Sequence, residues 1–224
     1  GQTQAQADPR LAAADSLFQR KQYTQSLEIY ESLFYEKQYS QAMLLRMAFI
    51  EERLGHVGSS LYYRNLYYSH TGDDRALEKI QQVASANRLI GYEHSELRII
   101  QHTINQYQTE INLATASVIL FLFVMLVYFK HKTCRKPFGF GFGLIIFCAI
   151  LFSNVNFNYR PVQGIVKQDR AYLMSGPSAG ASVVAIIGEG NMLPIIDKQD
   201  VWVQVTWNNK KAYIKESQLH KVQI

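Results

Sequence analysis

Cysteine is scarce in this chain of 224 residues, which contains only two. Cys134 lies in a basic segment and Cys148 lies in an apolar one, so residues 1–112 and 158–224 contain no cysteine. A disulfide framework therefore does not hold these two regions together, and a zinc site built on cysteine is excluded from them.

Residue patterns typical of catalysis are also missing. The histidines His56, His70, His94, His102, His131 and His220 include no His-Glu-x-x-His pair. The glycine-rich stretch 139–143 lacks the spacing and the lysine of a phosphate-binding loop, and Ser175 begins a turn that does not fit a nucleophile elbow. We therefore expect no catalytic residue, no metal site and no cofactor, and we expect that the protein is not an enzyme.

Charge is absent from two long apolar runs, residues 113–129 and 138–157. A helix rises about 1.5 Å per residue, so about 17–25 apolar residues span the hydrocarbon core of a bilayer. Buried helices of a soluble protein are the alternative, but such helices usually have a polar stripe, which residues 118–129 and 144–152 lack. The sequence therefore predicts a two-span transmembrane hairpin in a lipid bilayer.

Four basic residues lie between the two runs: Lys130, Lys132, Arg135 and Lys136. Short loops rich in Lys and Arg remain on the cytoplasmic side of a membrane. We therefore expect these residues to determine the topology, with a cytoplasmic basic loop at 131–137 and with residues 1–112 and 158–224 in the periplasm of a bacterial inner membrane. The isoelectric point of 9.1 then reflects topology, and we expect no nucleic-acid partner.

An exported N-terminal region needs a targeting signal, and residues 1–10 have neither a basic nor an apolar stretch of that kind. We expect that a signal peptide preceded Gly1 and was removed, leaving residues 1–8 as a flexible N-terminus.

The N-terminal region contains an internal repeat, because residues 17–34 align with residues 51–68 at an offset of 34. This offset is the period of tetratricopeptide repeats, and the packing positions resemble that family. The small contact residues would be Ala14, Ser26, Ala48 and Ser60. The repeats depart from the family pattern because Glu51 replaces a large apolar residue, and because the opening Trp and the closing Pro are absent. The resemblance implies a helical repeat domain at 9–92.

Local signals set the helix boundaries within this domain. Asp8 is placed to cap the first helix, and Gly72 is placed to end the fourth. Asp73 or Asp74 can cap a fifth helix at 75–86, which would close the array. Beyond a break at 87–92, apolar residues recur at helical spacing at Leu97, Ile100, Ile104, Tyr107 and Ile111. They predict one amphipathic helix at 93–130 that continues into the first span; its stripe would pack on the fifth helix or, alternatively, form a coiled coil.

Tetratricopeptide arrays expose a concave face formed by the first helix of each pair, which suits an extended peptide or a partner's helix. By this resemblance the candidate partner groove contains Asp15, Phe18, Gln19, Phe49, Glu52 and Arg53. For Phe18 and Phe49 the alternative is burial in the core or beneath the fifth helix.

From Gly164 onward the pattern changes to short β-rich runs separated by Gly and Pro turns. The motif residues are Tyr172, Ser175, Gly176, Pro177, Trp202 and Ile214, and residues 158–224 resemble a bacterial SH3-type domain. Met174 replaces the usual arginine, and Ala212-Tyr213 replaces the usual Gly-Trp. The resemblance implies a small all-β SH3-like barrel, in which the candidate functional residues are Tyr172, Trp202, Trp207 and Tyr213.

The order of these parts predicts a multidomain α + β membrane protein and is similar to that of BatE-like proteins of the Bacteroides aerotolerance (Bat) group. This resemblance implies a non-catalytic scaffold or adaptor that works with membrane proteins carrying von Willebrand A domains and, indirectly, with a MoxR-type AAA+ ATPase. A cell-wall sensor that binds peptidoglycan through the SH3-type domain is the alternative. The short cytoplasmic loop argues against extensive signalling, so we favour the scaffold.

Overall fold

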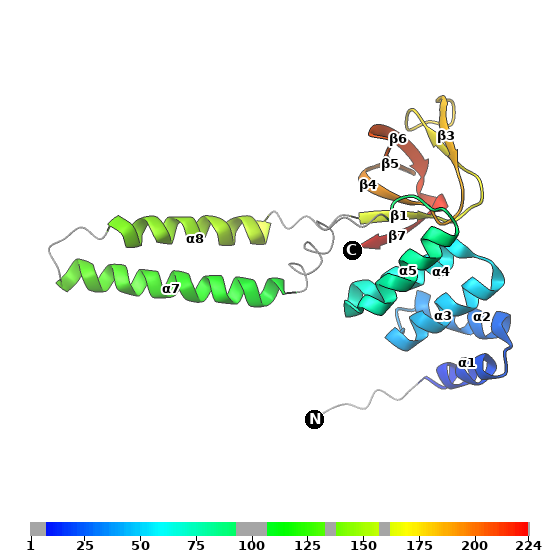
Figure 1. Ribbon diagram of the computed structural model, residues 1–224, viewed down its shortest axis with the longest axis horizontal. Coiled ribbons are helices and arrows are strands. Elements are labelled where there is room, and N and C mark those ends of the chain that lie inside the picture. Colours follow the sequence, from blue (N-terminus) through cyan, green and yellow to red (C-terminus); the bar gives the residue numbers. More distant parts are fainter. Residues whose placement is uncertain (1–7, 93–106, 133–137, 157–161, 224) are drawn as a thin grey trace. The chain divides into compact units, whose positions relative to one another are not determined.

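The computed structural model describes residues 8–92, 107–132, 138–156 and 162–223. The chain divides into two compact units (Figure 1). The first unit comprises Gly1–Glu93 and Pro161–Ile224, whose described residues form five α-helices and a β-sheet. The second comprises His94–Arg160, whose described residues form two α-helices.

The helices of the first unit include the predicted first and fifth helices. They are α1 (Pro9–Gln19), α2 (Tyr23–Tyr35), α3 (Gln41–Leu54), α4 (Val57–Thr71) and α5 (Asp74–Ala86). The Asp8 side chain accepts a hydrogen bond from the backbone N–H of Arg10 at 2.9 Å, and the Asp73 side chain accepts one from Arg75 at 3.0 Å. Gly72 ends α4 in the left-handed conformation. The predicted caps of α1 and α5 and the predicted end of α4 are therefore confirmed.

The two helix pairs α1–α2 and α3–α4 repeat one contact at an offset of 34 residues. The Ser26 hydroxyl donates to the carbonyl of Ala14 at 2.9 Å, and the Ser60 hydroxyl donates to the carbonyl of Ala48 at 2.8 Å. All four residues are fully buried, as expected for the positions where helices cross closely. In each pair an alanine and a serine thus allow the two helices to approach closely, and the serine hydroxyl links them.

Glu51 departs from the repeat pattern, and the structure shows how the carboxylate is accommodated. Its side chain is only 4% exposed, and its Oε2 lies 2.8 Å from Nδ1 of His56. Burial raises the pKa of Glu51 above its ordinary value, while His56 opposes that rise. A residue in the turn before α4 therefore satisfies the carboxylate.

The C-terminal part of the first unit is an antiparallel sheet with the strand order β3-β2-β6-β5-β4-β1-β7. Its strands are β1 (Val162–Val166), β2 (Ala171–Met174), β3 (Val183–Ile187), β4 (Met192–Gln199), β5 (Trp202–Trp207), β6 (Lys210–Lys215) and β7 (Leu219–Gln223). Asn208 and Asn209 both have positive φ, which matches the twist of a two-residue hairpin between β5 and β6. An Asn-Asn turn therefore joins these two strands.

The helices and the sheet share one hydrophobic core. Leu61 of α4 and Ile80 of α5 belong to the same buried cluster as Ile165, Met192 and Val222 of the sheet. In Figure 1, α4 and α5 lie next to β1 and β7, and α4 contacts both strands. The sequence predicted a helical part and a β part but not this packing of one against the other.

Backbone contacts also join the helices to the sheet, and we call this contact region the junction. The segment after α5 runs beside β4, where Met192 donates its N–H to the carbonyl of Ile90 at 3.0 Å. The Tyr92 hydroxyl donates to the carbonyl of Gly190 at 2.8 Å. A Cβ on Gly91, whose φ is +94°, would lie 2.2 Å from the carbonyl oxygen of Met192. The close approach of the two backbones therefore requires glycine at this position.

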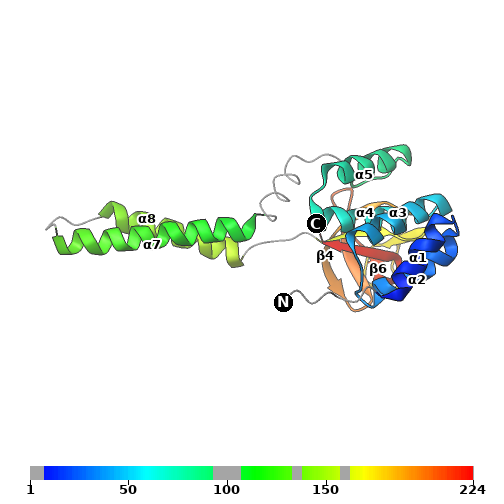
Figure 2. The same cartoon turned by 90° about the horizontal axis from the view of Figure 1, so that it is seen from below.

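The second unit is an antiparallel pair of helices, α7 (Gln108–Lys132) and α8 (Phe138–Asn156), which lie side by side in Figures 1 and 2. Gly143 of α8 faces the Leu122 side chain, and the Asn154 amide donates to Oδ1 of Asn112 at 2.7 Å. Small residues thus permit the helices to approach closely, and one polar pair links them.

Of the described helices, α7 alone is long and apolar enough to cross a membrane by length and composition. The apolar part of α8, Gly139–Val155, is shorter. Lys130 and Lys132 belong to the last turn of α7, whereas the sequence had placed the basic loop from residue 131 onward. Arg135 and Lys136 lie outside the described residues, as do residues 93–106 of the predicted long helix.

Candidate functional site

Three aromatic rings from three helices meet on the first unit. Phe18 of α1, Tyr23 at the start of α2 and Phe49 of α3 have ring centroids 5.7–5.8 Å apart, in tilted or edge-to-face arrangements. All three side chains are half-buried. Phe18 and Tyr23 also pack against the buried core of the repeats. Phe18 and Phe49 therefore contact other side chains and still reach solvent.

Two guanidinium groups lie against this aromatic cluster, which we define as Phe18, Tyr23 and Phe49. The Arg46 guanidinium is 5.9 Å from the Phe18 ring centroid, and the Arg53 guanidinium is 5.3 Å from that of Phe49. Both distances are within the range of cation–π attraction. Arg53 is exposed, so its guanidinium remains accessible to a partner.

Asp15 is engaged within the chain. Its carboxylate pairs with Arg46 and accepts a hydrogen bond from the Tyr30 hydroxyl at 2.6 Å. Burial, and then the hydrogen bond to Asp15, raise the pKa of Tyr30 to about 12. Asp15 therefore orients Arg46 beside the aromatic cluster.

Glu52 is also engaged within the chain. Its carboxylate pairs with Arg64 of α4 and lies 3.4 Å from the ammonium of Lys79 of α5. These ion pairs join helices α3, α4 and α5. Glu52 therefore has the role of a link between helices, which the sequence did not predict.

The structure thus brings together some of the residues predicted for the partner groove. Phe18, Phe49 and Arg53 come together, and Gln19 lies exposed at the last residue of α1. Sequence reasoning missed Arg46, although its position three residues before Phe49 on one helix was a usable signal. Aromatic edges beside an exposed guanidinium suit a peptide segment that carries both apolar and acidic groups.

The four candidate residues of the β part do not form one site. Tyr172 is 44% exposed on β2, whereas Trp202 is buried at the start of β5 and Trp207 is half-buried at its end. The Tyr213 hydroxyl donates to Oε1 of Gln204 at 3.2 Å. Tyr172 therefore contributes to a surface, and Trp202 belongs to the interior.

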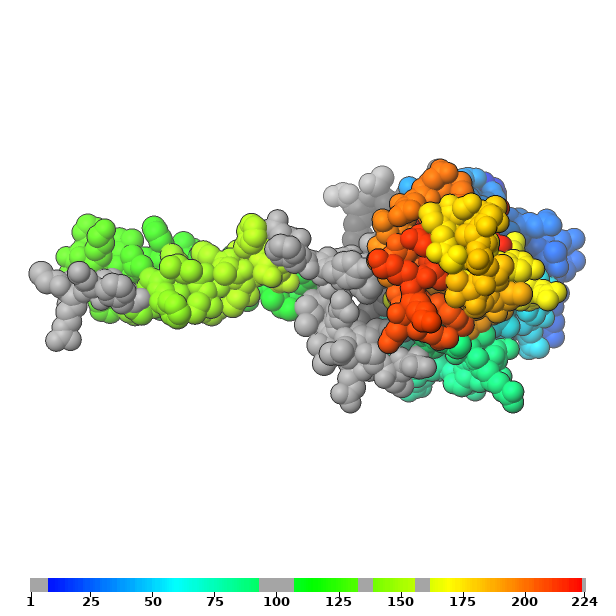
Figure 3. Space-filling view, turned by 90° about the horizontal axis from the view of Figure 1, so that it is seen from above, coloured from blue at the N-terminus to red at the C-terminus, as the bar shows by residue number. Residues whose placement is uncertain are grey.

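An exposed apolar strip lies on the β2–β3 ribbon and contains Tyr172, Val184 and Ile186. Tyr172 and Ile186 are directly paired across the two strands, so both side chains lie on one face. This part of the chain, coloured yellow, faces the viewer in Figure 3. The strip is an exposed apolar surface of the described β part.

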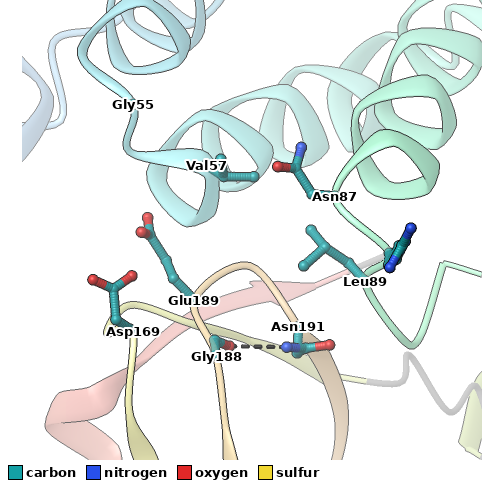
Figure 4. A pocket seen from close by; sticks show the side chains of 9 residues that line it. Gly55, Val57, Asn87, Leu89, Asp169, Gly188, Glu189 and Asn191 are labelled. Carbon is teal, nitrogen blue, oxygen red and sulfur yellow. Dashed lines mark hydrogen bonds between the residues drawn. The ribbon is translucent and has the colours of Figure 1, made fainter.

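A pocket of 330 Å³ opens where the helices meet the sheet (Figure 4). Oε1 of Glu189 accepts a hydrogen bond from the backbone N–H of Gly58 at 2.7 Å. The amide of Asn191 donates to the carbonyl of Gly188, and that of Asn87 donates to the carbonyl of Val83. The Glu189 bond joins α4 to the β part, whereas the two asparagine bonds are local, so these polar groups of the pocket wall have structural roles.

Within the described ranges, no three His, Cys, Asp or Glu side chains lie close enough together to hold a metal ion.

Comparison with known proteins identifies one segment. Residues 167–221 match the family model of the bacterial SH3 domain. The match includes β2 to β6 and most of β7, so the predicted SH3-type domain is confirmed for these residues. No curated protein and no solved structure matches the chain.

Proposed function

We propose that this chain is a non-catalytic scaffold that binds protein partners on the periplasmic face of a bacterial inner membrane. The observation that supports this proposal best is the aromatic cluster with the exposed Arg53 beside it. Aromatic and arginine side chains are enriched among the residues that contribute most of the binding energy at protein interfaces. The cluster also lies on a unit whose helices and sheet share a core, so a partner would meet a preorganised surface.

The membrane attachment is part of the proposal. In it, α7 and α8 form a two-span hairpin, and Lys130 and Lys132 keep the connecting loop in the cytoplasm. The length and composition of α7, and the packing of the apolar α8 along it, support this arrangement. Both chain segments of the first unit would then lie in the periplasm.

The partners follow from the resemblance of the domain order to the Bat group. We propose tetratricopeptide-type repeats that contact membrane proteins with von Willebrand A domains, and an indirect association with a MoxR-type ATPase. The repeated serine–carbonyl contact at an offset of 34 residues supports the assignment of the repeats.

The test is purification of the tagged full chain from its native membrane in a mild detergent, followed by identification of the proteins that remain bound. Recovery of von Willebrand A-type membrane proteins is the expected result. Recovery of the chain alone would contradict the scaffold.

A second function has its own support in the SH3-domain match and in the exposed strip of Tyr172, Val184 and Ile186. In this alternative the β part binds peptidoglycan. Sedimentation of the purified chain with isolated peptidoglycan, lost when Tyr172 and Ile186 are replaced by Ser, would favour it over the scaffold.

A further inference from the structure

His220 lies where the sheet meets the helices. Its ring, on β7, is stacked on Tyr62 of α4, with centroids 4.3 Å apart and planes at 12°. Nε2 of His220 lies 3.4 Å from the hydroxyl of Ser59, also on α4. The imidazole therefore belongs to the contact between the two parts of the first unit.

The charged and titratable groups around this ring offer no compensation for a positive charge. From α4 it faces Ser59 and the phenol of Tyr62, and Lys167, in the turn after β1, acts on it as a like charge. The neighbouring Lys221 forms an ion pair with Glu216. Among the described residues, no carboxylate pairs with the imidazole of His220.

The neutral form of the His220 imidazole is therefore favoured while β7 packs against α4, an arrangement that we call the docked state. Burial, and then Lys167, lower the pKa of His220 to about 4. The Tyr62 ring face attracts a cation and so opposes part of this lowering. When β7 and α4 separate, the imidazole enters water and regains an ordinary pKa of about 6.5.

We propose that the stack of His220 on Tyr62 is an acid-sensitive latch, in which protonation of His220 releases the β part from α4. The latch controls whether helices α1–α5 and the SH3-type domain stay packed together as one rigid body. It goes beyond the proposed scaffold and does not depend on the identity of any partner.

The direction of the effect follows from proton linkage. The separated state binds the proton more tightly than the docked state, so docking is strongest above pH 6.5 and weakens as the pH falls from 6.5 toward 4. Between pH 7 and pH 5 the ratio of separated to docked molecules should rise about 10- to 20-fold.

Hydrogen–deuterium exchange of the full chain in detergent micelles measures this ratio at the junction. The reporters are the backbone N–H groups of Gly58, Ile90 and Met192, which all donate across the junction. Wild type is compared with His220→Phe at the same pH, so that the chemical exchange rates cancel. Phe keeps a stacked ring and cannot be protonated.

At pH 5 the reporters should exchange about 10- to 20-fold faster in wild type than in His220→Phe, after normalisation to their ratio at pH 7. His220→Gln should dock less tightly at both pH values but also lose the pH response. His70→Gln, which changes an exposed histidine at the other end of α4, should respond as wild type does.

Lys167→Gln gives an independent signature, because removal of the like charge should reduce the response to pH. An equal acceleration in wild type and in both His220 variants would overturn the latch. So would a wild-type junction whose protection is the same at the two pH values.

Discussion

The carboxylate of Glu189 accepts a hydrogen bond from the backbone N–H of Gly58 at 2.7 Å, so a turn of the β part caps the first turn of α4. The residue at the N-cap position of α4, His56, makes no capping hydrogen bond with its own side chain. A helix of the repeats thus obtains its cap from a residue 131 positions later in the chain. The stability of the first turn of α4 therefore depends on the turn between β3 and β4.

Replacing Glu189 tests this dependence. Glu189→Ala should lower the free energy of unfolding by about 1 kcal/mol, the usual effect of losing a capping side chain, and Glu189→Gln should cost less because its amide oxygen can accept. Urea unfolding followed by tryptophan fluorescence measures this, since both tryptophans lie in the β part. Asp169→Ala, an exposed change in the same pocket, should have no effect; equal losses would argue against the cap.

Gly58 provides a second test of the junction. Alanine is favoured over glycine in a helix by about 1 kcal/mol, but a Cβ here would lie 2.6 Å from the carbonyl oxygen of Val166. Gly58→Ala should therefore destabilise the chain by about 1–3 kcal/mol in the same urea measurement. At Gly188 the nearest atom to a Cβ is 3.7 Å away, so Gly188→Ala should be nearly neutral. A more stable Gly58→Ala chain would mean that the two parts do not pack this closely.

Lys21 offers a stabilising change. It has a φ of +61° at the end of α1, and Gly55 occupies the equivalent position 34 residues later with a φ of +88°. A non-glycine residue in this conformation costs about 1 kcal/mol. Lys21→Gly should raise the free energy of unfolding by about 0.5–1 kcal/mol. Arg20→Gly, at a φ of −79°, should give no gain, and a gain there would separate the effect from the backbone conformation.

Much of this fold follows from local patterns in the sequence. The caps at Asp8 and Asp73, the small contacts at Ser26 and Ser60, and the Asn-Asn turn each depend on residues close in the chain or on a repeat within it. Such signals are readable because backbone geometry restricts which residues fit.

The docking of the sheet on α4 and α5 was not predictable in the same way. It depends on complementary surfaces formed by residues more than 100 positions apart, such as Ile80 and Met192. A single sequence does not specify such long-range pairs. Gly58 was a weak signal, since nothing in the helix itself requires glycine there.

The candidate site shows the same division. The resemblance to tetratricopeptide repeats selected Phe18, Phe49 and Arg53, and these residues do come together. The choice of ion-pair partners for Asp15 and Glu52 depends on how α3 packs on its neighbours, which the sequence does not show.

Trp202 is a core residue in the structure, with 9% of its surface exposed. Trp202→Ala should therefore destabilise the β part by about 3–5 kcal/mol, as large deletions in cores do. The half-buried Trp207 should cost less when replaced by Ala. The full chain is needed, because Ile165 and Val222 are buried in the core shared with the helices. An unaltered urea midpoint for Trp202→Ala, followed through Trp207, would assign Trp202 to a binding surface instead.

The most direct test of the scaffold compares partner recovery by wild type and by Phe49→Ala/Arg53→Ala in a mild-detergent pull-down from native membranes. The matched control is Tyr35→Ala/Lys37→Ala, which also removes one aromatic and one basic side chain but at the end of α2. The account predicts that partners are lost at least 10-fold from the first variant and retained by the control, with membrane insertion unchanged in both; each 10-fold loss corresponds to about 1.4 kcal/mol of binding free energy. Equal recovery by all three chains would contradict the assignment of the partner site to the face formed by α1 and α3.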